Sequence, residues 1–406
     1  MSYSKSIRPV VLTFLHYYLP GSKSGGPVRT IANMVEALGD RIDFRIVTAD
    51  RDVGEIERYQ HLAASDGWQD VGNAKVLYLA PSNRRMRDIS KIIRETTHDT
   101  LYLNSFFDPV FTAKPLLARR LGLAPVTRCV VAPRGEFSPG ALKLKAARKR
   151  VFRVVSRPIG IYHGLIWQAS SDREAQDIAR EMAGAATDIR VATDLPAHAL
   201  APVPSVHSPR AEGQPLRVVF LSRISPMKNL VFALEVVKQV QTPMSFDIYG
   251  QLEDQAYWAR CETLIAQMPS HVAVRYRGSL DHHDVSATLA RYDLFFLPTH
   301  GENYGHAIVE SLAVGTPVLI SDATPWRNLT AQGIGWDLSL RDTAPFVASL
   351  ETMSARGQAE EARHRHLAAA FFQKQLHDKG ALADNLSLFA PGGDTTPTKE
   401  RYPLNE

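Results

Sequence analysis

Two glutamates follow a short apolar segment in the second half of the chain, and their spacing predicts one shared site. Residues 293–297, Asp-Leu-Phe-Phe-Leu, predict a parallel strand buried on both faces. Glu302 lies in the turn that follows, and Glu310 lies two helical turns later on a helix predicted over 304–314. Ligands of open α/β sheets bind at the carboxyl ends of the strands, so both carboxylates are expected to face one crevice. Backbone N–H groups at the start of the helix would point into it, from Asn303, Tyr304 and Gly305.

Two basic side chains follow another apolar segment, at residues 216–221. Arg223 and Lys228 lie five residues apart on a loop that leads into a helix. A guanidinium and an ammonium in that position suit a phosphate-bearing ligand. The alternatives remain open: the basic pair is solvated, Glu302 stabilises the helix start electrostatically, and Glu310 is solvated.

The wider sequence around the glutamates resembles a known family. Gly305 lies between Glu302 and Glu310, and Gly315-Thr316-Pro317-Val318 and Thr324-Pro325-Trp326 follow. This string resembles the nucleotide-sugar site of the retaining family-4 glycosyltransferases. The resemblance is strongest over 216–340 and also covers 9–40 and 126–180. It implies the α/β GT-B fold, with two Rossmann-like doubly wound domains that face each other across a cleft.

The resemblance also implies roles for these residues. Arg223 and Lys228 would bind the diphosphate of the donor as it leaves, Glu302 would hold hydroxyls of the donor sugar, and Glu310 would hold the ribose diol. Further donor contacts are implied at the turn Gly278, Ser279, Leu280, where the nucleobase would rest, and at the glycine loop with Gly25 and Gly26. For the glycine loop, a tight strand-to-helix turn without a ligand is the alternative.

The acceptor side is expected in the first half of the chain, after the strand predicted over 126–132. Pro133-Arg134-Gly135 resembles a segment found in a subset of the family, although many members place a histidine near this point and this chain does not. Arg134 would contact the acceptor or a phosphate, and Glu136 would orient the acceptor hydroxyl. The alternative is an ordinary turn with a local ion pair. A second departure is Thr193-Asp194, which replaces the family's Asn-Gly turn.

The length of 406 residues suits two domains. We predict an N-terminal acceptor-binding domain over 1–205 and a C-terminal nucleotide-sugar-binding domain over 206–390, joined by a proline-rich stretch at 201–214. A long helix at about 357–377 is expected to cross back to the first domain. The polar tail 391–406 is expected to be disordered.

Composition narrows the function further. Two cysteines cannot form a disulfide framework or a zinc site, and no apolar run approaches the roughly 18 residues of a membrane span, so a cytoplasmic protein is expected. No nucleic-acid-binding motif is present, and the histidines show no paired metal-ligand spacing. We therefore expect neither a nucleic-acid partner nor a metal, and no cofactor besides the nucleotide diphosphate sugar that serves as donor.

Charge is concentrated in the first half of the chain. Residues 1–210 carry 30 Lys and Arg against 20 Asp and Glu, a balance of +10, and the remainder carries 17 against 22, a balance of −5. A helix predicted over 141–157 places basic side chains on one side, with an aromatic beside them: Lys145, Lys149, Arg153 and Phe152. This pattern favours peripheral contact with an anionic membrane on its cytoplasmic face. A solvated face and a site for anionic substrate are the alternatives.

The sequence as a whole favours a retaining glycosyltransferase that acts on a lipid-linked or saccharide acceptor in bacterial surface-polysaccharide biosynthesis. A nucleotide-sugar 2-epimerase shares the architecture, but its acid/base carboxylate and histidine set is not evident from the sequence. A non-catalytic partner that binds nucleotide sugar is the third alternative.

Overall fold

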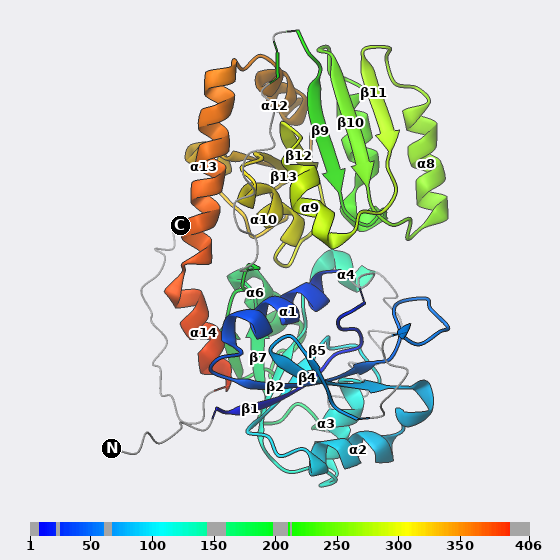
Figure 1. Ribbon diagram of the computed structural model, residues 1–406, viewed down its shortest axis with the longest axis vertical. Coiled ribbons are helices and arrows are strands. Elements are labelled where there is room, and N and C mark those ends of the chain that lie inside the picture. The colour runs from blue at the N-terminus through cyan, green and yellow to red at the C-terminus, as the bar shows by residue number, and fades with distance from the viewer. Residues whose placement is uncertain are drawn as a thin grey trace.

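The computed structural model describes residues 8–21, 25–60, 67–143, 160–197, 210–211 and 213–389. These form two α/β domains stacked along the long axis of the molecule (Figure 1). Three predicted features lie outside the described residues. They are residues 201–209 of the linker, the tail 391–406, and the membrane residues Lys145, Lys149, Phe152 and Arg153.

The N-terminal domain is built on an eight-stranded sheet in the order β3-β4-β2-β1-β5-β6-β7-β8. Neighbouring strands pair in parallel except β3 with β4. The strands are β1 (Val10–Phe14), β2 (Asp43–Ala49), β3 (Gln69–Val71), β4 (Ala74–Leu79), β5 (Thr100–Asn104), β6 (Arg128–Ala132), β7 (Ile166–Ala169) and β8 (Asp188–Val191). The described helices are α1 (Gly26–Leu38), α2 (Met86–Glu95), α3 (Ala113–Arg120), α4 (Pro139–Lys143) and α6 (Asp172–Glu181).

The C-terminal domain has a six-stranded parallel sheet in the order β11-β10-β9-β12-β13-β14. Its strands are β9 (Leu216–Leu221), β10 (Met244–Tyr249), β11 (Val272–Tyr276), β12 (Leu294–Leu297), β13 (Val318–Ser321) and β14 (Gly335–Leu338). The helices around it are α7 (Leu230–Val237), α8 (Gln255–Ile265), α9 (His282–Leu289), α10 (His306–Ala313), α11 (Leu329–Gln332) and α12 (Ala344–Ser354). Every residue of β12 is buried, as a parallel strand covered by helices on both faces requires.

The chain crosses back to the first domain, but one helix later than the sequence predicted. The helix expected to cross is α13 (Gln358–Leu376), which packs on the C-terminal domain, where Ala368 and Phe372 join the core. The crossing is completed by α14 (Lys379–Phe389), whose Phe389 is buried in the N-terminal domain. Figure 1 shows α13 and α14 running along one side of both domains. The two domains are therefore tied together by α14 as well as by the linker.

None of the helices that the structure describes is both long enough and apolar enough to span a bilayer.

Candidate functional site

Lys228 and Glu302 meet at the carboxyl ends of two adjacent strands. Lys228 ends a 3-10 turn (Pro226–Lys228) after β9, and Glu302 lies in the loop after β12, which pairs with β9. The Lys228 Nζ lies 2.5 Å from the Glu302 Oε1, and their side chains are only 13% and 12% exposed. Because burial strengthens the interaction of charges with each other and with a ligand, this pair forms a preorganised polar centre.

Arg223 lies on the same loop and faces the N-terminal domain. Its Nη1 is 2.9 Å from the Glu253 Oε1, in a pair that is half exposed on both sides. A Cβ atom added to Gly25 would lie 3.8 Å from the Arg223 Nε, and one added to Gly26 would lie 3.9 Å from the His306 Cδ2. The glycine loop thus lies directly across the domain junction from Arg223 and His306. Gly25 has a φ of 69°, which a larger residue would adopt only with strain.

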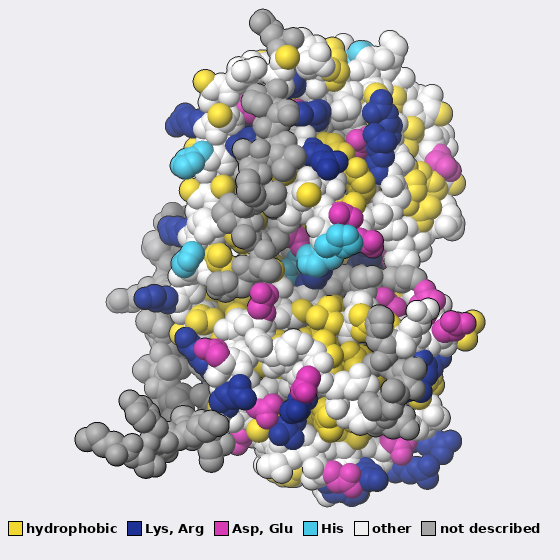
Figure 2. All heavy atoms as spheres, in the orientation of Figure 1, with side chains coloured by type: hydrophobic (Ala, Val, Ile, Leu, Met, Phe, Trp, Pro, Cys, Tyr) yellow, Lys and Arg dark blue, Asp and Glu magenta, His cyan; other side chains and the backbone are white. Residues whose placement is uncertain are grey.

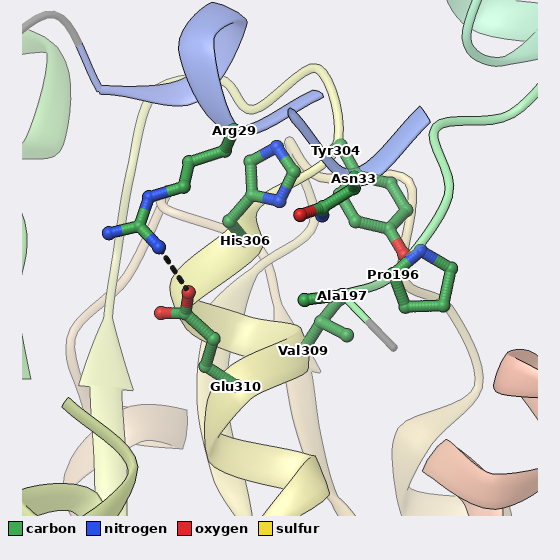
Figure 3. A pocket seen from close by; sticks show the side chains of 8 residues that line it. All are labelled: Arg29, Asn33, Pro196, Ala197, Tyr304, His306, Val309 and Glu310. Carbon is green, nitrogen blue, oxygen red and sulfur yellow. Dashed lines mark ion pairs between the residues drawn. The ribbon is translucent and has the colours of Figure 1, made fainter. Parts of the chain in front are cut away.

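Glu310 on α10 is opposed by Arg29 on α1, from the other domain (Figure 3). The Arg29 Nη1 lies 3.6 Å from the Glu310 Oε1, and the Glu310 side chain is 10% exposed. Burial raises the pKa of Glu310, and the charge of Arg29 opposes that rise. The pocket that these side chains share with Asn33, Tyr304 and His306 has a volume of only about 10 Å³. The ribose contact of Glu310 stays a prediction.

Histidines gather at the same junction, which Figure 2 shows as a group of imidazoles between the two domains. The His306 Nε2 lies 3.1 Å from the Thr30 Oγ1 on α1. His282 contacts the Arg29 guanidinium, and its Nδ1 lies 4.0 Å from the Glu310 Oε1. His282 is thus part of the domain junction.

The turn before α10 is held by aromatic packing. The helix begins at His306, two residues later than predicted, after Gly305 in the left-handed region at φ 84°. The Trp326 Nε1 donates a 2.5 Å hydrogen bond to the Tyr304 carbonyl, and the two rings lie 5.5 Å apart. The Tyr304 side chain is part of the core, so only backbone groups of Tyr304 can approach a ligand.

Gly278, Ser279 and Leu280 lie after β11, at the outer edge of the same sheet end. A Cβ atom added to Gly278 would meet nothing within 4 Å among the described atoms, and its carbonyl accepts the Gly250 N–H at 2.9 Å. Strand β10 separates β11 from β9, so this turn lies roughly 10 Å across the sheet from the Arg223 loop. The nucleobase contact stays a prediction.

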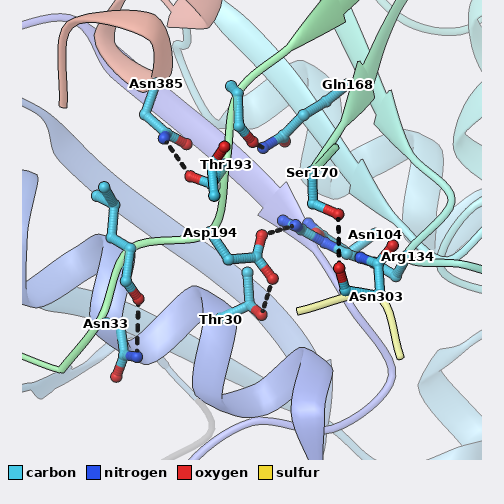
Figure 4. Close-up of polar contacts among 12 residues, drawn as sticks. Thr30, Asn33, Asn104, Arg134, Gln168, Ser170, Thr193, Asp194, Asn303 and Asn385 are labelled. Carbon is cyan, nitrogen blue, oxygen red and sulfur yellow. Dashed lines mark hydrogen bonds and ion pairs between the residues drawn. The ribbon is translucent and has the colours of Figure 1, made fainter. Parts of the chain in front are cut away.

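Arg134 is the centre of a buried polar network in the N-terminal domain (Figure 4). Its Nη1 lies 2.6 Å from the Asp194 Oδ1, and the two side chains are 5% and 2% exposed. Its other nitrogens bond to the Asn104 Oδ1 and the Tyr102 hydroxyl. The Thr30 hydroxyl donates to the second oxygen of Asp194 at 2.7 Å. Asp194, which stands where the resembled family has an Asn-Gly turn, is therefore the counter-charge of Arg134. All the contacts of Arg134 and Asp194 named here are with other residues of the chain.

Glu136 is likewise engaged inside its own domain. Its Oε1 accepts the Ser105 hydroxyl at 2.7 Å, and its Oε2 accepts the backbone N–H groups of Phe106 at 2.6 Å and Phe107 at 3.0 Å. These contacts fix the loop after β5. The acceptor contacts of Arg134 and Glu136 stay predictions, since both side chains have structural partners in the geometry described.

Comparison with known proteins adds the family. Residues 206–336, which contain Arg223, Lys228, Glu302 and Glu310, match the family described as "Glycosyl transferases group 1". This match lies within the second domain. The chain is 29% identical over 154 residues to the putative colanic acid biosynthesis glycosyltransferase WcaL of Salmonella typhimurium, and the match covers 36% of the chain and 38% of that protein. It is 27% identical over 158 residues to the amylovoran biosynthesis glycosyltransferase AmsK of Erwinia amylovora, covering 36% and 38%. The chain thus matches just over a third of the length of these curated relatives.

Solved structures match the whole architecture. Anabaena Alr3699/HepE in complex with UDP and glucose superposes with a TM-score of 0.66 at 14% identity, over 94% of this chain and 98% of that one. WaaG, a glycosyltransferase involved in lipopolysaccharide biosynthesis, superposes with a TM-score of 0.63 at 13% identity, over 94% and 100%. The GT-B fold predicted from the sequence is confirmed. Membership of family 4 within the group stays a prediction.

Several residues at the junction of the two domains were not predicted from the sequence. Arg29 and Thr30 follow the glycine loop by one helical turn, so their place on α1 is a signal that could have been used. His306 directly follows the helix-start glycine and could have been found in the same way. Glu174 on α6 joins two loops, because its carboxylate accepts the Gly135 N–H at 2.6 Å and the Ser170 N–H at 2.8 Å.

The half-buried imidazole of His306 predicts a loss of stability in mild acid. Burial lowers its pKa from 6.5 to about 4, although the nearby Asp194 carboxylate raises it. Between these values the unfolded chain binds a proton that the folded protein does not, so the free energy of unfolding falls as the pH drops from about 6.5 towards 4. We expect a loss on the order of 1–2 kcal/mol in urea unfolding, because the partly exposed ring keeps some solvent screening. His306→Gln should flatten this dependence, and an unchanged slope in that variant would refute it.

Proposed function

We propose that the protein is a retaining glycosyltransferase that moves a sugar from a nucleotide diphosphate sugar to a lipid-linked or saccharide acceptor in bacterial surface-polysaccharide biosynthesis. The observation that carries this proposal is the convergence of Arg223, Lys228, Glu302 and Glu310 on one side of the domain junction. It is supported by the family match in the second domain and by the relatives named for colanic acid and amylovoran biosynthesis.

The geometry suggests how the donor is held. Lys228 and Arg223 would bind the diphosphate. The sugar at one end of the diphosphate would contact Glu302, and the ribose at the other end would contact Glu310. Arg29 would release Glu310 as the ribose binds. Arg29 then remains available for the anionic donor on the opposite wall.

Retention follows from attack on the same face as the leaving group. The acceptor oxygen bonds to the anomeric carbon while the bond from that carbon to the diphosphate breaks. The acceptor proton passes to the departing phosphate oxygen, and the basic pair stabilises the charge that develops there.

A screen of nucleotide sugars tests this proposal directly. UDP-, GDP- and ADP-sugars should be compared for protection against thermal unfolding, beginning with UDP-glucose, which a structurally similar protein binds. A ligand at one hundred times its dissociation constant adds about 2.7 kcal/mol to the free energy of unfolding. We expect protection by one nucleotide class and sugar transfer from that donor. Protection by none of them would overturn the proposal.

Transfer should not depend on a divalent metal, because Arg223 and Lys228 are placed to meet the diphosphate charge. We expect the rate in excess EDTA to match the rate without it. A complete loss of transfer that magnesium or manganese restores would show that a cation shares the task.

Peripheral membrane contact is part of the proposal and rests on the sequence. Each basic residue near an anionic bilayer contributes about 1 kcal/mol, so the predicted helix over 141–157 should bind reversibly and more weakly at high salt. We expect sedimentation with anionic but not zwitterionic vesicles, abolished by the combined changes Lys145→Glu, Lys149→Glu and Arg153→Glu. Equal sedimentation of the parent and this triple variant would refute the role of the helix.

A further inference from the structure

A histidine–carboxylate pair lies on the N-terminal domain, apart from the donor residues. The His16 Nδ1 lies 2.7 Å from the Asp108 Oδ2, with side chains 35% and 7% exposed. His16 follows β1 and Asp108 follows β5, and these strands are paired neighbours in the sheet. The pair therefore lies at the carboxyl end of the sheet, the edge from which the glycine loop also departs.

Asp108 is held rigidly and in its ionised form. Its Oδ1 accepts the backbone N–H groups of Val110 at 2.8 Å and Phe111 at 2.6 Å. Burial raises the pKa of Asp108, but the contacts with His16 and these two N–H groups outweigh it and bring the pKa below the ordinary value. A carboxylate only accepts hydrogen bonds, so the His16 Nδ1 must donate.

In the neutral form of His16, the other ring nitrogen is an oriented hydrogen-bond acceptor. In the neutral imidazole with a proton on Nδ1, the Nε2 carries a lone pair. Among the described residues, no hydrogen bond to this Nε2 is formed. The ring is fixed by stacking on Tyr17, at 4.3 Å between centroids and 28° between planes, and by Phe111 at 5.1 Å. A partly exposed acceptor on a rigid ring, beside an aromatic face, suits a polyhydroxylated ligand.

The pair lies at the same edge of the N-terminal sheet as a turn that touches the C-terminal domain. That turn follows β6, where a Cβ atom on Gly135 would lie 3.2 Å from the Asn303 Cβ, next to Glu302. Strand β5 separates β1 from β6, so His16 lies roughly 10 Å along the sheet from that contact. The loop from His16 continues to Gly25, opposite Arg223. His16 is thus at the edge of the N-terminal sheet that faces the donor residues.

We propose that His16 accepts a hydrogen bond from a hydroxyl group of the acceptor substrate and that Asp108 is its positioning residue. This inference rests on the glycosyltransferase function proposed above and assigns the acceptor a polyhydroxylated, saccharide-like character at this point. The hydroxyl that His16 binds is not the reacting one, because in same-face transfer the reacting hydroxyl gives its proton to the diphosphate.

The inference can be tested by nuclear magnetic resonance on protein labelled with ¹⁵N-histidine. His16 is assigned by its absence in His16→Gln, and the tautomer of each ring is read from its two nitrogen shifts. The labelled protein is titrated with the methyl glycosides of glucose, galactose and mannose, with and without UDP. We expect an unprotonated Nε2 on His16 in the parent, and a shift of that resonance with at least one glycoside.

Variants separate positioning from structure. Asp108→Asn should move the His16 proton towards Nε2 and weaken glycoside binding by about tenfold, the worth of one lost hydrogen bond. UDP affinity in this variant should equal that of the parent. His163→Gln, at an exposed histidine of the same domain, is the control and should leave glycoside affinity unchanged.

A protonated Nε2 in the parent, or no shift of His16 with any of the three glycosides, would overturn the inference. Failure of UDP to bind would count against a UDP-sugar donor in the proposed function. The tautomer of His16 and the glycoside titrations without UDP would still decide the role of His16.

Discussion

Glu302→Gln should lower the rate of sugar transfer by about 100-fold or more and leave nucleotide affinity close to that of the parent. Its carboxylate lies against Lys228 in a nearly buried pair, at the position proposed for the donor sugar. Loss of one preorganised electrostatic group in such a site costs about 100- to 1,000-fold in rate. The contacts proposed for the nucleotide are made by other residues, so the substitution should lower turnover rather than nucleotide affinity.

Glu310→Gln should give the complementary result. The proposed two-point contact with the ribose is present in both the ground state and the transition state, so its loss raises the dissociation constant of the nucleotide by about 10- to 100-fold. Titration calorimetry with the nucleotide and initial rates with the donor would separate the two effects. Glu262→Gln, on the exposed side of α8, is the matched control in the same domain. Parent-like affinity and turnover in both site variants would remove these carboxylates from the site.

The donor side of the site could be predicted because its residues are local in sequence. Residues 293–297 predicted the buried strand, and Glu302 and Glu310 follow it on the same loop and helix. The carboxyl end of a parallel strand places such residues at one edge whatever the rest of the fold does.

The contacts of the N-terminal domain at the site could not be predicted in this way, because they join distant parts of the chain. Arg29 meets Glu310 only once the two domains are placed against each other. Likewise, Asp108 binds the backbone of the turn that follows it, through the Phe111 N–H. Its second partner, His16, lies on a neighbouring strand end, and the order of the strands cannot be read from their sequences.

Arg134 shows the same limit for a buried charge. The Pro-Arg-Gly segment indicated a functional arginine, but the sequence could not reveal that Asp194 would lie 2.6 Å away and take the place of a ligand charge. With both side chains almost fully buried, the ion pair holds the turn after β6 against the segment that follows β8. That segment leads into the linker, so the pair connects the turn after β6 to the domain boundary.

Asp194→Ala should therefore lower the free energy of unfolding by about 3–5 kcal/mol, since it leaves the Arg134 guanidinium buried without its counter-charge. The matched control is Asp188→Ala, which breaks the pair with Arg190 on β8, where the side chains are 41% and 34% exposed. A pair exposed to that extent contributes about 0–1 kcal/mol. Replacing both buried partners, by Arg134→Met with Asp194→Leu, should recover much of the loss because no unpaired charge remains. Urea unfolding followed by circular dichroism would compare the four proteins. Equal losses in Asp194→Ala and Asp188→Ala would show that Arg134 finds another partner or reaches solvent, and that the network in Figure 4 is not what holds the turn after β6 in place.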